Sequence, residues 1–218
     1  IDNTNSPVWQ AVSVTDGTVT TNGGFAHPKN NQMLAYDLDG NLTSDGVWAY
    51  EWDGENRLKS MTMTNLAGVP NAQRKRLEFG YDFMGRRFSK VVYAWNGGVF
   101  TGPSTNYFVY DGWNLLATFT PQLSTLNSFL WGQDLSGTMN KAGGVGGLLA
   151  VLENGNGHFT MYDGNGNITG LIKADKTPSA RYEYSPFGET LTSTGPLASV
   201  NPFRFSTKFH DDESGLVY

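Results

Sequence analysis

The stretch Tyr162-Asp163-Gly164-Asn165-Gly166-Asn167-Ile168-Thr169 has the composition of a strand that ends in a turn and resumes as a second strand. Tyr162 is an aromatic residue of the kind that strands prefer, and it can bury about 150–250 Å². Asp163 can accept hydrogen bonds from N–H groups of the turn, and glycine can adopt the left-handed conformation that a tight turn needs. Ile168 then begins the return strand on the buried face. The stretch predicts a β-hairpin anchored by its aromatic ring.

The same pattern of an aromatic residue, a turn that contains glycine and an apolar residue recurs along the chain. The predicted structural anchors of the copies are Tyr36, Asp37, Gly40, Trp52, Asp53, Tyr81, Asp82, Gly85, Tyr110, Asp111, Tyr162, Asp163 and, in a weaker copy, Tyr184 and Gly188. The spacing of the copies is irregular, which favours hairpins of variable length over a strict solenoid. Because one hairpin is only marginally stable in water, the copies must stack or continue one sheet.

Between its turns the chain alternates apolar and polar residues, as in Leu77, Phe79 and Tyr81, and shows no helical period. Among 218 residues, 27 are glycine and 9 are proline, and only 16% are charged, which favours many tight turns. The predicted fold is all-β: an antiparallel, curved or spiralling sheet of hairpins, as part of a shell-like or stacked assembly. We expect divergent strands in residues 1–32 and the repeat sheet in residues 33–218.

Charge and composition exclude several classes of protein. The net charge of −5 and the isoelectric point of about 5.1 argue against binding to nucleic acid or to an anionic membrane. No apolar stretch approaches the roughly 18 residues that a membrane span requires. The chain has no cysteine, which excludes disulfides and thiolate sites. It begins at Ile1 without a leader, so we expect no signal peptide and a processed or excised piece.

Candidate metal ligands are few and scattered. The three histidines, His27, His158 and His210, lack the spacing of a zinc site. The aspartate-rich turns at Asp37 and Asp163 hint at calcium loops, but their glycine stands at the fourth position instead of the sixth. Asx turns, in which the carboxylate bonds to its own turn, explain them better. The sequence therefore predicts no metal, no cofactor and no catalytic residue.

Two local clusters favour structural roles. The run Gly143–Gly147 does not match a nucleotide-binding fingerprint and predicts a tight strand crossing or a close approach of two backbones. Basic residues concentrate between Arg74 and Lys90. This strip predicts a solubilised strand edge or, as an alternative, a contact with an acidic partner.

The end of the chain makes the pattern specific. It contains Arg181-Tyr182-Glu183-Tyr184-Ser185-Pro186-Phe187-Gly188-Glu189, then Asn201–Lys208, then Asp211–Tyr218. Together with the tyrosine-aspartate hairpins, these stretches resemble the YD repeats and the repeat-associated core of Rhs proteins, over roughly residues 33–218. The positions that carry the core resemblance are Pro202, Phe203, Arg204, Phe205, Asp212 and Gly215.

The resemblance implies a structural segment of a hollow shell, a long spiralling β-sheet that encloses a C-terminal toxic domain. Rhs polymorphic toxins and the similar C components of Tc toxins are built in this way. The aspartyl autoprotease segment of the family would lie beyond Tyr218, so we expect a chain that is not an enzyme. The resemblance also implies a secreted or cell-surface bacterial location. Expected partners are further shell chain or identical copies through sheet edges, an enclosed toxin domain, or a surface glycan.

Two other function classes stay open at this point. A carbohydrate-binding or adhesion module would use exposed aromatic platforms such as Trp113. A glycoside hydrolase would need paired carboxylates, whose separation a sequence does not show. Glu51, Glu78, Glu153 and Glu183 alternate with apolar or aromatic residues, which is more typical of the solvated face of a sheet.

Overall fold

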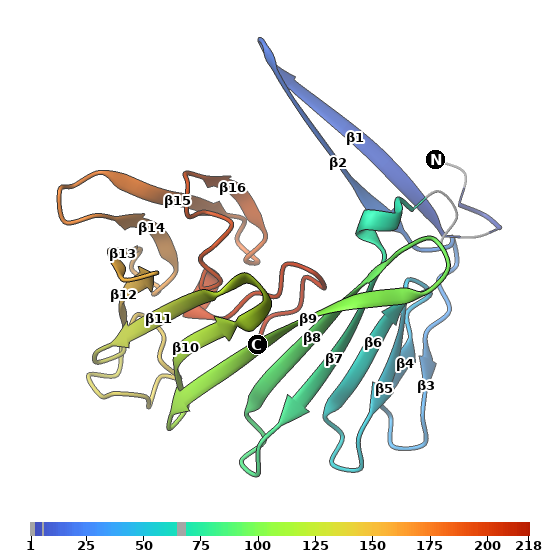
Figure 1. Cartoon of the computed structure of the whole chain (residues 1–218), viewed down its shortest axis with the longest axis horizontal. Coiled ribbons are helices and arrows are strands. Elements are labelled where there is room, and N and C mark those ends of the chain that lie inside the picture. Colours follow the sequence, from blue (N-terminus) through green and yellow to red (C-terminus); the bar gives the residue numbers. More distant parts are fainter. Residues whose placement is uncertain (1–2, 6, 65–68) are drawn as a thin grey trace. The chain divides into compact units, whose positions relative to one another are not determined.

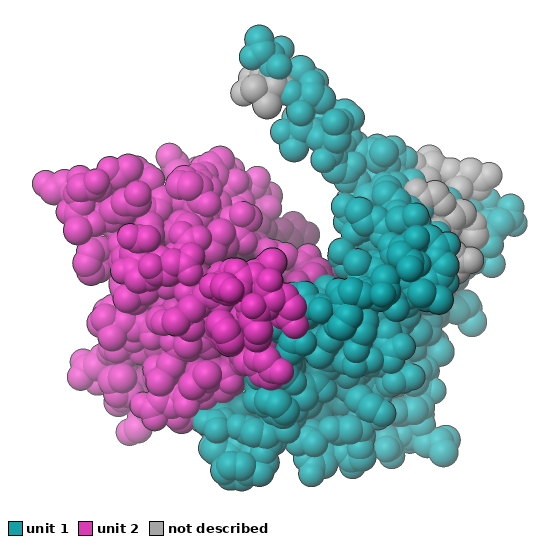
Figure 2. Space-filling view, viewed as in Figure 1, with its two compact units in different colours: residues 1–105 teal, residues 106–218 magenta. Residues whose placement is uncertain are grey.

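The computed structural model describes residues 3–5, 7–64 and 69–218, and it is all-β with a large antiparallel sheet, which confirms the predicted fold class (Figure 1). The chain forms two compact units, residues 1–105 and 106–218 (Figure 2). The predicted boundary between residues 32 and 33 does not coincide with this division and stays a prediction; residues 1–2 and 6 of that N-terminal region lie outside the described residues.

The first unit contains eight complete strands among its described residues. They are β1 (Val8–Asp16), β2 (Val19–His27), β3 (Ala35–Tyr36), β4 (Leu42–Ser44), β5 (Trp48–Trp52), β6 (Leu58–Met63), β7 (Lys75–Tyr81) and β8 (Arg87–Trp95). Strands β1 and β2 form a separate two-stranded ribbon, and the sheet order begins with β3. A short 3-10 turn, Asn71–Gln73, precedes β7.

Strand β9 (Phe100–Asp111) begins in the first unit and ends in the second. The second unit continues with β10 (Asn114–Thr120), β11 (Thr125–Trp131), β12 (Leu148–Glu153), β13 (Asn156–Tyr162), β14 (Ile168–Ile172), β15 (Pro178–Tyr184) and β16 (Thr190–Thr194). Two more 3-10 turns, Pro121–Leu123 and Phe205–Thr207, complete the described elements.

From β3 to β16 the strand order follows the sequence, and each strand is antiparallel to the next. Antiparallel order places alternate turns at opposite ends of the strands. The turns that follow β3, β5 and β7 therefore share one rim in the first unit, as Figure 1 shows. In the second unit the turns that follow β11, β13 and β15 share a rim in the same way.

The first unit has a small core on one face of its sheet. Trp48, Met61, Leu77 and Phe79 are buried there, and Met61 lies directly opposite Leu77 in the β6–β7 register. Arg87 and Lys90 of β8 are each only 3% exposed, so the prediction of a solubilised basic strip is wrong at these two positions. Lys90 lies opposite Phe79 and Arg87 opposite Tyr81, at the C-terminal end of β7, and the Arg87 guanidinium lies over the Phe79 ring, 5.5 Å from its centroid.

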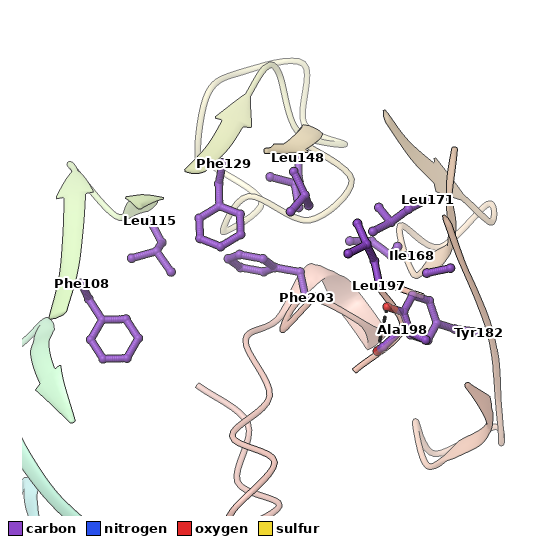
Figure 3. Packing of buried hydrophobic residues seen from close by; sticks show 12 residues of the cluster. Phe108, Leu115, Phe129, Leu148, Ile168, Leu171, Tyr182, Leu197, Ala198 and Phe203 are labelled. Atoms are coloured by element: carbon purple, nitrogen blue, oxygen red, sulfur yellow. Dashed lines mark hydrogen bonds between the residues drawn. The ribbon is translucent and has the colours of Figure 1, made fainter. Parts of the chain in front are cut away.

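The second unit has a larger core because its C-terminal segment, defined as residues 195–218, folds back onto the sheet. Figure 3 shows Phe203 from this segment pointing toward Phe129 of β11, with Leu197 and Ala198 near Tyr182 of β15. The Phe203 and Phe129 rings meet edge to face, 4.9 Å between centroids. The side chains on both sides of these contacts are buried, so the segment completes the hydrophobic core of the second unit.

Candidate functional site: ring-to-carbonyl contacts and the C-terminal segment

The aspartates of the repeats accept hydrogen bonds from their own turns. At Asp82, Oδ1 accepts N–H bonds from Met84 and Arg86, both 2.9 Å long, and Oδ2 accepts one from Arg86 Nε at 2.8 Å. Asp37, Asp53 and Asp163 make the same set of bonds in their turns. These Asx turns are the ones predicted in place of calcium loops.

The same bonds stabilise the ionised carboxylates. A hydrogen bond from the Asn41 side chain is the largest cause that lowers the pKa of Asp37 below its ordinary value of 3.8. At Asp163, partial burial raises the pKa, but hydrogen bonds from Asn167 and Asn165 outweigh it and the net pKa is lowered. The turns therefore hold these aspartates in the charged form at neutral pH.

The fourth residue of each turn, counted from the aspartate, adopts the left-handed conformation. Gly40, Gly85 and Gly166 have φ values of 86°, 78° and 77°. In the Asp53 turn this position is Asn56, with φ 58°, and Gly54 does not take it, contrary to the expected role of glycine. Asparagine tolerates this conformation better than other residues with a side chain, which explains the exchange.

The predicted copy at Tyr110 forms a different turn. Asp111 lies directly opposite Asn114, so Gly112 and Trp113 make a two-residue hairpin loop without the Asx bonds. Gly112 has φ 55°. The weaker copy, in contrast, follows the common geometry: Ser185 Oγ accepts the turn N–H groups in place of a carboxylate, and Gly188 has φ 88°.

Several repeat rings reach back to the repeat before them. The Trp52 indole N–H donates to the Leu42 carbonyl at 2.8 Å, and the Tyr81 hydroxyl donates to the Leu58 carbonyl at 2.9 Å. In the second unit Tyr162 donates to the Leu148 carbonyl at 2.6 Å. We call this interaction the ring-to-carbonyl contact.

The contact repeats because the register repeats. Leu42 lies opposite Tyr36, Leu58 opposite Trp52, and Ile168 opposite Tyr162. Each acceptor is therefore the residue opposite the preceding ring. The pattern holds again for Tyr184, whose hydroxyl donates to the Ile168 carbonyl at 2.6 Å. Burial raises the pKa of the Tyr184 hydroxyl, which keeps it protonated and able to donate.

One member of the series was missed by the sequence analysis. Trp131 donates its indole N–H to the Leu115 carbonyl at 2.7 Å, and Leu115 lies opposite Tyr110. The signal was present, because Asp134-Leu135-Ser136-Gly137 repeats the pattern of Asp37-Leu38-Asp39-Gly40. The aspartate stands three residues after the ring instead of one, and this spacing hides the copy.

The glycine run after that copy is packed as predicted. A Cβ built on Gly144 would lie 3.1 Å from the Trp131 ring, and one on Gly147 would lie 3.2 Å from the Gly132 carbonyl oxygen. Asp134 is buried and its Oδ2 accepts N–H bonds from Ala142 and Gly144. The run is a close approach of two backbones around a buried carboxylate.

The C-terminal segment binds to the turns of two repeats. Thr207 Oγ1 donates to the Gly166 carbonyl at 2.7 Å and accepts the Gly146 N–H at 2.9 Å. The Ser206 N–H donates to Asn167 Oδ1 at 2.8 Å, and Phe205 meets Tyr184 edge to face. The segment therefore joins neighbouring hairpins on the rim where the Asx turns lie.

The other core-signature positions hold the segment in shape. Arg204 pairs with Asp212 at 3.0 Å, and its guanidinium lies 5.9 Å from the Tyr182 ring centroid. Pro202 accepts the His210 N–H through its carbonyl at 2.9 Å. Gly215 has φ 72° and donates its N–H to the Asp211 carbonyl at 2.7 Å. These contacts show where the core-signature residues lie in the fold. The functional role of these residues stays a prediction.

The second unit contains one buried histidine, His158, and one half-buried histidine, His210. His158 is 3% exposed and its Nδ1 shares a hydrogen bond with Ser179 Oγ at 2.8 Å. His210 packs near Arg204, and its Nε2 is buried without a hydrogen-bond partner. Burial is the main cause that lowers the pKa of both imidazoles, so both are neutral at pH 7.

Two open cavities lie in the second unit. One, of about 600 Å³, is lined by aromatic and polar side chains that include Tyr184, Phe205, Asn165 and Glu183. The other, of about 500 Å³, is lined by His158, Glu153, Lys173 and Asp175 among others. Glu51 accepts a hydrogen bond from Ser60 and Glu78 accepts one from Tyr93, and neither glutamate is among the residues that line these cavities. No three metal-ligating side chains gather among the residues that the structure describes.

The fold and the contacts can be compared with known proteins. No family model matches the chain. In sequence it is 32% identical over 193 residues to the tRNA3(Ser)-specific nuclease WapA of Bacillus spizizenii, a match that covers 87% of this chain and 7% of that protein. It is 31% identical, with the same coverage, to the tRNA nuclease WapA of Bacillus subtilis. A further relative is salivary gland surface protein 1 of Aedes aegypti, at 29% identity over 86% of this chain and 5% of that protein.

Two solved structures share the fold at 16% identity. The complex TcdB2-TccC3 and the Tc holotoxin pore of Photorhabdus luminescens each give a TM-score of 0.59 over 84% of this chain, and 9% and 8% of theirs. These matches show a shared fold. The chain spans only 5–7% of the length of the curated relatives named above.

The comparisons contradict the expectation of a chain that is not an enzyme. The two bacterial relatives are named as nucleases, and the chain aligns with each of them over 193 residues. The chain corresponds to 7% of each nuclease.

Proposed function

We propose that this chain is a structural YD-repeat segment of an Rhs-like toxin, in which its sheet forms part of a wall around another domain. The ring-to-carbonyl contact is the observation that carries the proposal. Trp52, Tyr81, Tyr162 and Tyr184 each bind their hairpin to the one before it, so hairpins can be added side by side and the wall can extend. The similarity to WapA nucleases and to TccC3-containing complexes supports the same assignment.

The partners that we propose are further wall-forming segments, joined through sheet edges, and an enclosed toxin domain. The complex of TcdB2 with TccC3, which shares this fold, is an assembly of named components and supports a role in assembly. We also propose a secreted or bacterial cell-surface location. Among the described residues, no helix has the length and apolar character of a membrane span.

Electron cryo-microscopy of the natural protein that carries this sequence tests the proposal. The expected result is that residues 33–218 form part of a closed wall with a separate domain on its inner side. An open sheet with no enclosed domain would contradict it. The variant Phe203→Ala in the same protein should loosen the C-terminal segment, because Phe203 contacts Phe129 and Trp131. Phe187→Ala, at a 94% exposed position, is the matched control.

A second candidate function is glycan binding, and the aromatic-lined cavity of the second unit favours it. Tyr184 and Phe205 offer ring surfaces beside the polar groups of Asn165 and Glu183 in a space of about 600 Å³. Trp113 is 57% exposed in its hairpin loop and offers a second surface. Binding in a glycan screen that Phe205→Ala or Trp113→Ala abolishes, with folding retained, would support this function. Binding that neither variant changes would count against it.

A further inference from the structure

Two edge positions of the ring-to-carbonyl series have no counterpart in the described part of the chain. Tyr36 is the first ring of the series, it is 57% exposed, and the structure gives its hydroxyl no hydrogen bond. Thr190 lies opposite Tyr184, as Ile168 lies opposite Tyr162, so it occupies the acceptor position of the last repeat. One edge therefore presents an unused donor and the other an unused acceptor position.

The register defines how a ring meets its acceptor strand. In the β14–β15 pair Gly170 lies opposite Arg181, which places the acceptor Ile168 opposite Glu183, the residue before Tyr184. In the β6–β7 pair Ser60 lies opposite Glu78, which places Leu58 opposite Gly80, the residue before Tyr81. The ring strand is antiparallel to the acceptor strand in both pairs. A strand that carries Tyr36 would follow the same geometry if Thr190 lay opposite Ala35.

That geometry brings matching side chains together. With Thr190 opposite Ala35, Leu191 lies opposite Leu34. Both leucines are exposed, by 67% and 49% of their surface, and their contact would bury apolar area on each edge. Strand β16 reads Thr-Leu-Thr-Ser-Thr and has neither a lysine nor a proline to protect its edge from pairing. Its bulge, where Glu183 pairs with Thr192 and Tyr184 with Thr190, has counterparts in β6 and β14, and both of those strands also pair on their other side.

The chain does not cover the β16 edge with its own following residues. After Gly195 the C-terminal segment turns back, and the Leu197 N–H donates to the Ser179 carbonyl at 2.9 Å. Leu197 and Ala198 then enter the core of the second unit. The strand order accordingly ends at β16 and begins at β3.

We propose that β16 of one copy of this chain pairs antiparallel with β3 of a second copy, and that the Tyr36 hydroxyl of the second copy donates to the Thr190 carbonyl of the first. The inference rests on the proposed wall function and names the partner of its edges. The contact joins different surfaces of the two copies, so each pair leaves one donor edge and one acceptor edge open. Copies therefore add in a row.

Sedimentation of the intact chain from micromolar to hundreds of micromolar concentration tests the contact. The expected result is association that increases with concentration. Tyr36→Phe removes one neutral hydrogen bond and should weaken the association constant about three- to tenfold. Tyr107→Phe, at an exposed tyrosine of β9, is the control and should leave association unchanged. A monomer over the whole range, or equal effects of the two variants, would overturn the proposal.

A blocked edge gives an independent readout. Leu191→Lys places a charge on β16 and should abolish association. Leu130→Lys, at a 55% exposed position of β11, should not. Circular dichroism shows that each variant has folded, and loss of association in both variants would count against an edge-specific contact.

The register itself can be tested because the chain has no cysteine. Leu34→Cys chains mixed with Leu191→Cys chains should form a mixed disulfide dimer on oxidation. Leu34→Cys mixed with Ser193→Cys, two residues out of register, should form much less. Equal yields would overturn the register. If the chain is monomeric in sedimentation but microscopy shows it in a closed wall, the contact between β16 and β3 of two copies is overturned. The proposed function then stands.

Discussion

The Tyr184 hydroxyl donates a hydrogen bond to the main-chain carbonyl of Ile168, across the strand pair that joins two repeats. Ile168 is fully buried, so its carbonyl has little access to water if the hydroxyl is removed. A side chain of one hairpin thus satisfies the backbone of another. This relationship ties the identity of the repeat ring, tyrosine or tryptophan, to a polar function that phenylalanine lacks.

Tyr184→Phe should destabilise the second unit. The variant keeps the ring but leaves the Ile168 carbonyl without its donor, which costs about 1 kcal/mol of unfolding free energy. We expect the melting temperature to fall by about 2–4 °C in thermal denaturation. Tyr107→Phe, at an exposed tyrosine, is the control. An unchanged melting temperature for Tyr184→Phe would show that the contact contributes nothing.

Two glycines of one turn should respond differently to alanine. Gly166 has φ 77°, and a Cβ there would lie 2.6 Å from Val145 Cγ1. Gly166→Ala should therefore cost about 1–3 kcal/mol of unfolding free energy. Gly164 has no atom within 4 Å of its Cβ position, so Gly164→Ala should change stability by less than about 0.5 kcal/mol. Urea denaturation of both variants measures the difference, and equal losses would contradict the turn geometry.

Phe203→Ala should release the C-terminal segment. Phe203 is 4% exposed and meets the rings of Phe129, Trp131 and Phe209, so its truncation leaves a cavity that costs about 3–5 kcal/mol. Limited proteolysis should then cut residues 195–218 earlier than in the parent chain. Phe187→Ala should leave both stability and cleavage rate unchanged, since Phe187 is 94% exposed. Similar behaviour of the two variants would rule out the anchoring role of Phe203.

Mild acid should destabilise the second unit. The pKa values of His158 and His210 are lowered from 6.5 in the folded chain, chiefly by burial and then by Lys173 and Arg204 respectively. As the pH falls, the unfolded chain therefore takes up protons at a higher pH than the folded chain does. The stability that depends on neutral His158 and His210 is fully present above pH 6.5 and declines below it. Urea denaturation between pH 7.5 and 5.5 measures this slope.

The double variant His158→Gln with His210→Gln identifies the source of that slope. We expect it to flatten the pH dependence even if it lowers the stability at pH 7.5. His27→Gln, in the other unit, should leave the slope as it is. A slope that persists in the double variant would assign the acid sensitivity to other groups.

The chemistry of each turn predicted the hairpins of this fold, whereas the burial of individual side chains depends on packing between strands. Tyr81, Asp82 and Gly85 follow the predicted hairpin because ring, carboxylate and glycine each have a role inside one turn. The Tyr110 copy differs in spacing, because Leu115 follows its ring by five residues whereas Arg87 follows Tyr81 by six. Its turn is accordingly shorter, and Asp111 pairs directly with Asn114.

The sequence also did not predict which individual side chains are buried. Arg87 and Lys90 read as a solubilising strip because only their charge is visible in the sequence, while the structure places both among the buried residues of β8. Tyr36 shows the reverse case. Its ring was expected to be buried, but it lies on the first strand of the sheet order and is 57% exposed.

The backward direction of the ring-to-carbonyl contact has a consequence for biosynthesis. Trp52 reaches Leu42, and Tyr184 reaches Ile168, so each donor finds an acceptor that left the ribosome earlier. A nascent chain can thus fasten every new hairpin as soon as its ring emerges, without waiting for later sequence. At the growing edge, each new strand stays unpaired only until the next one emerges, and this limits the time during which that edge could recruit the wrong neighbour.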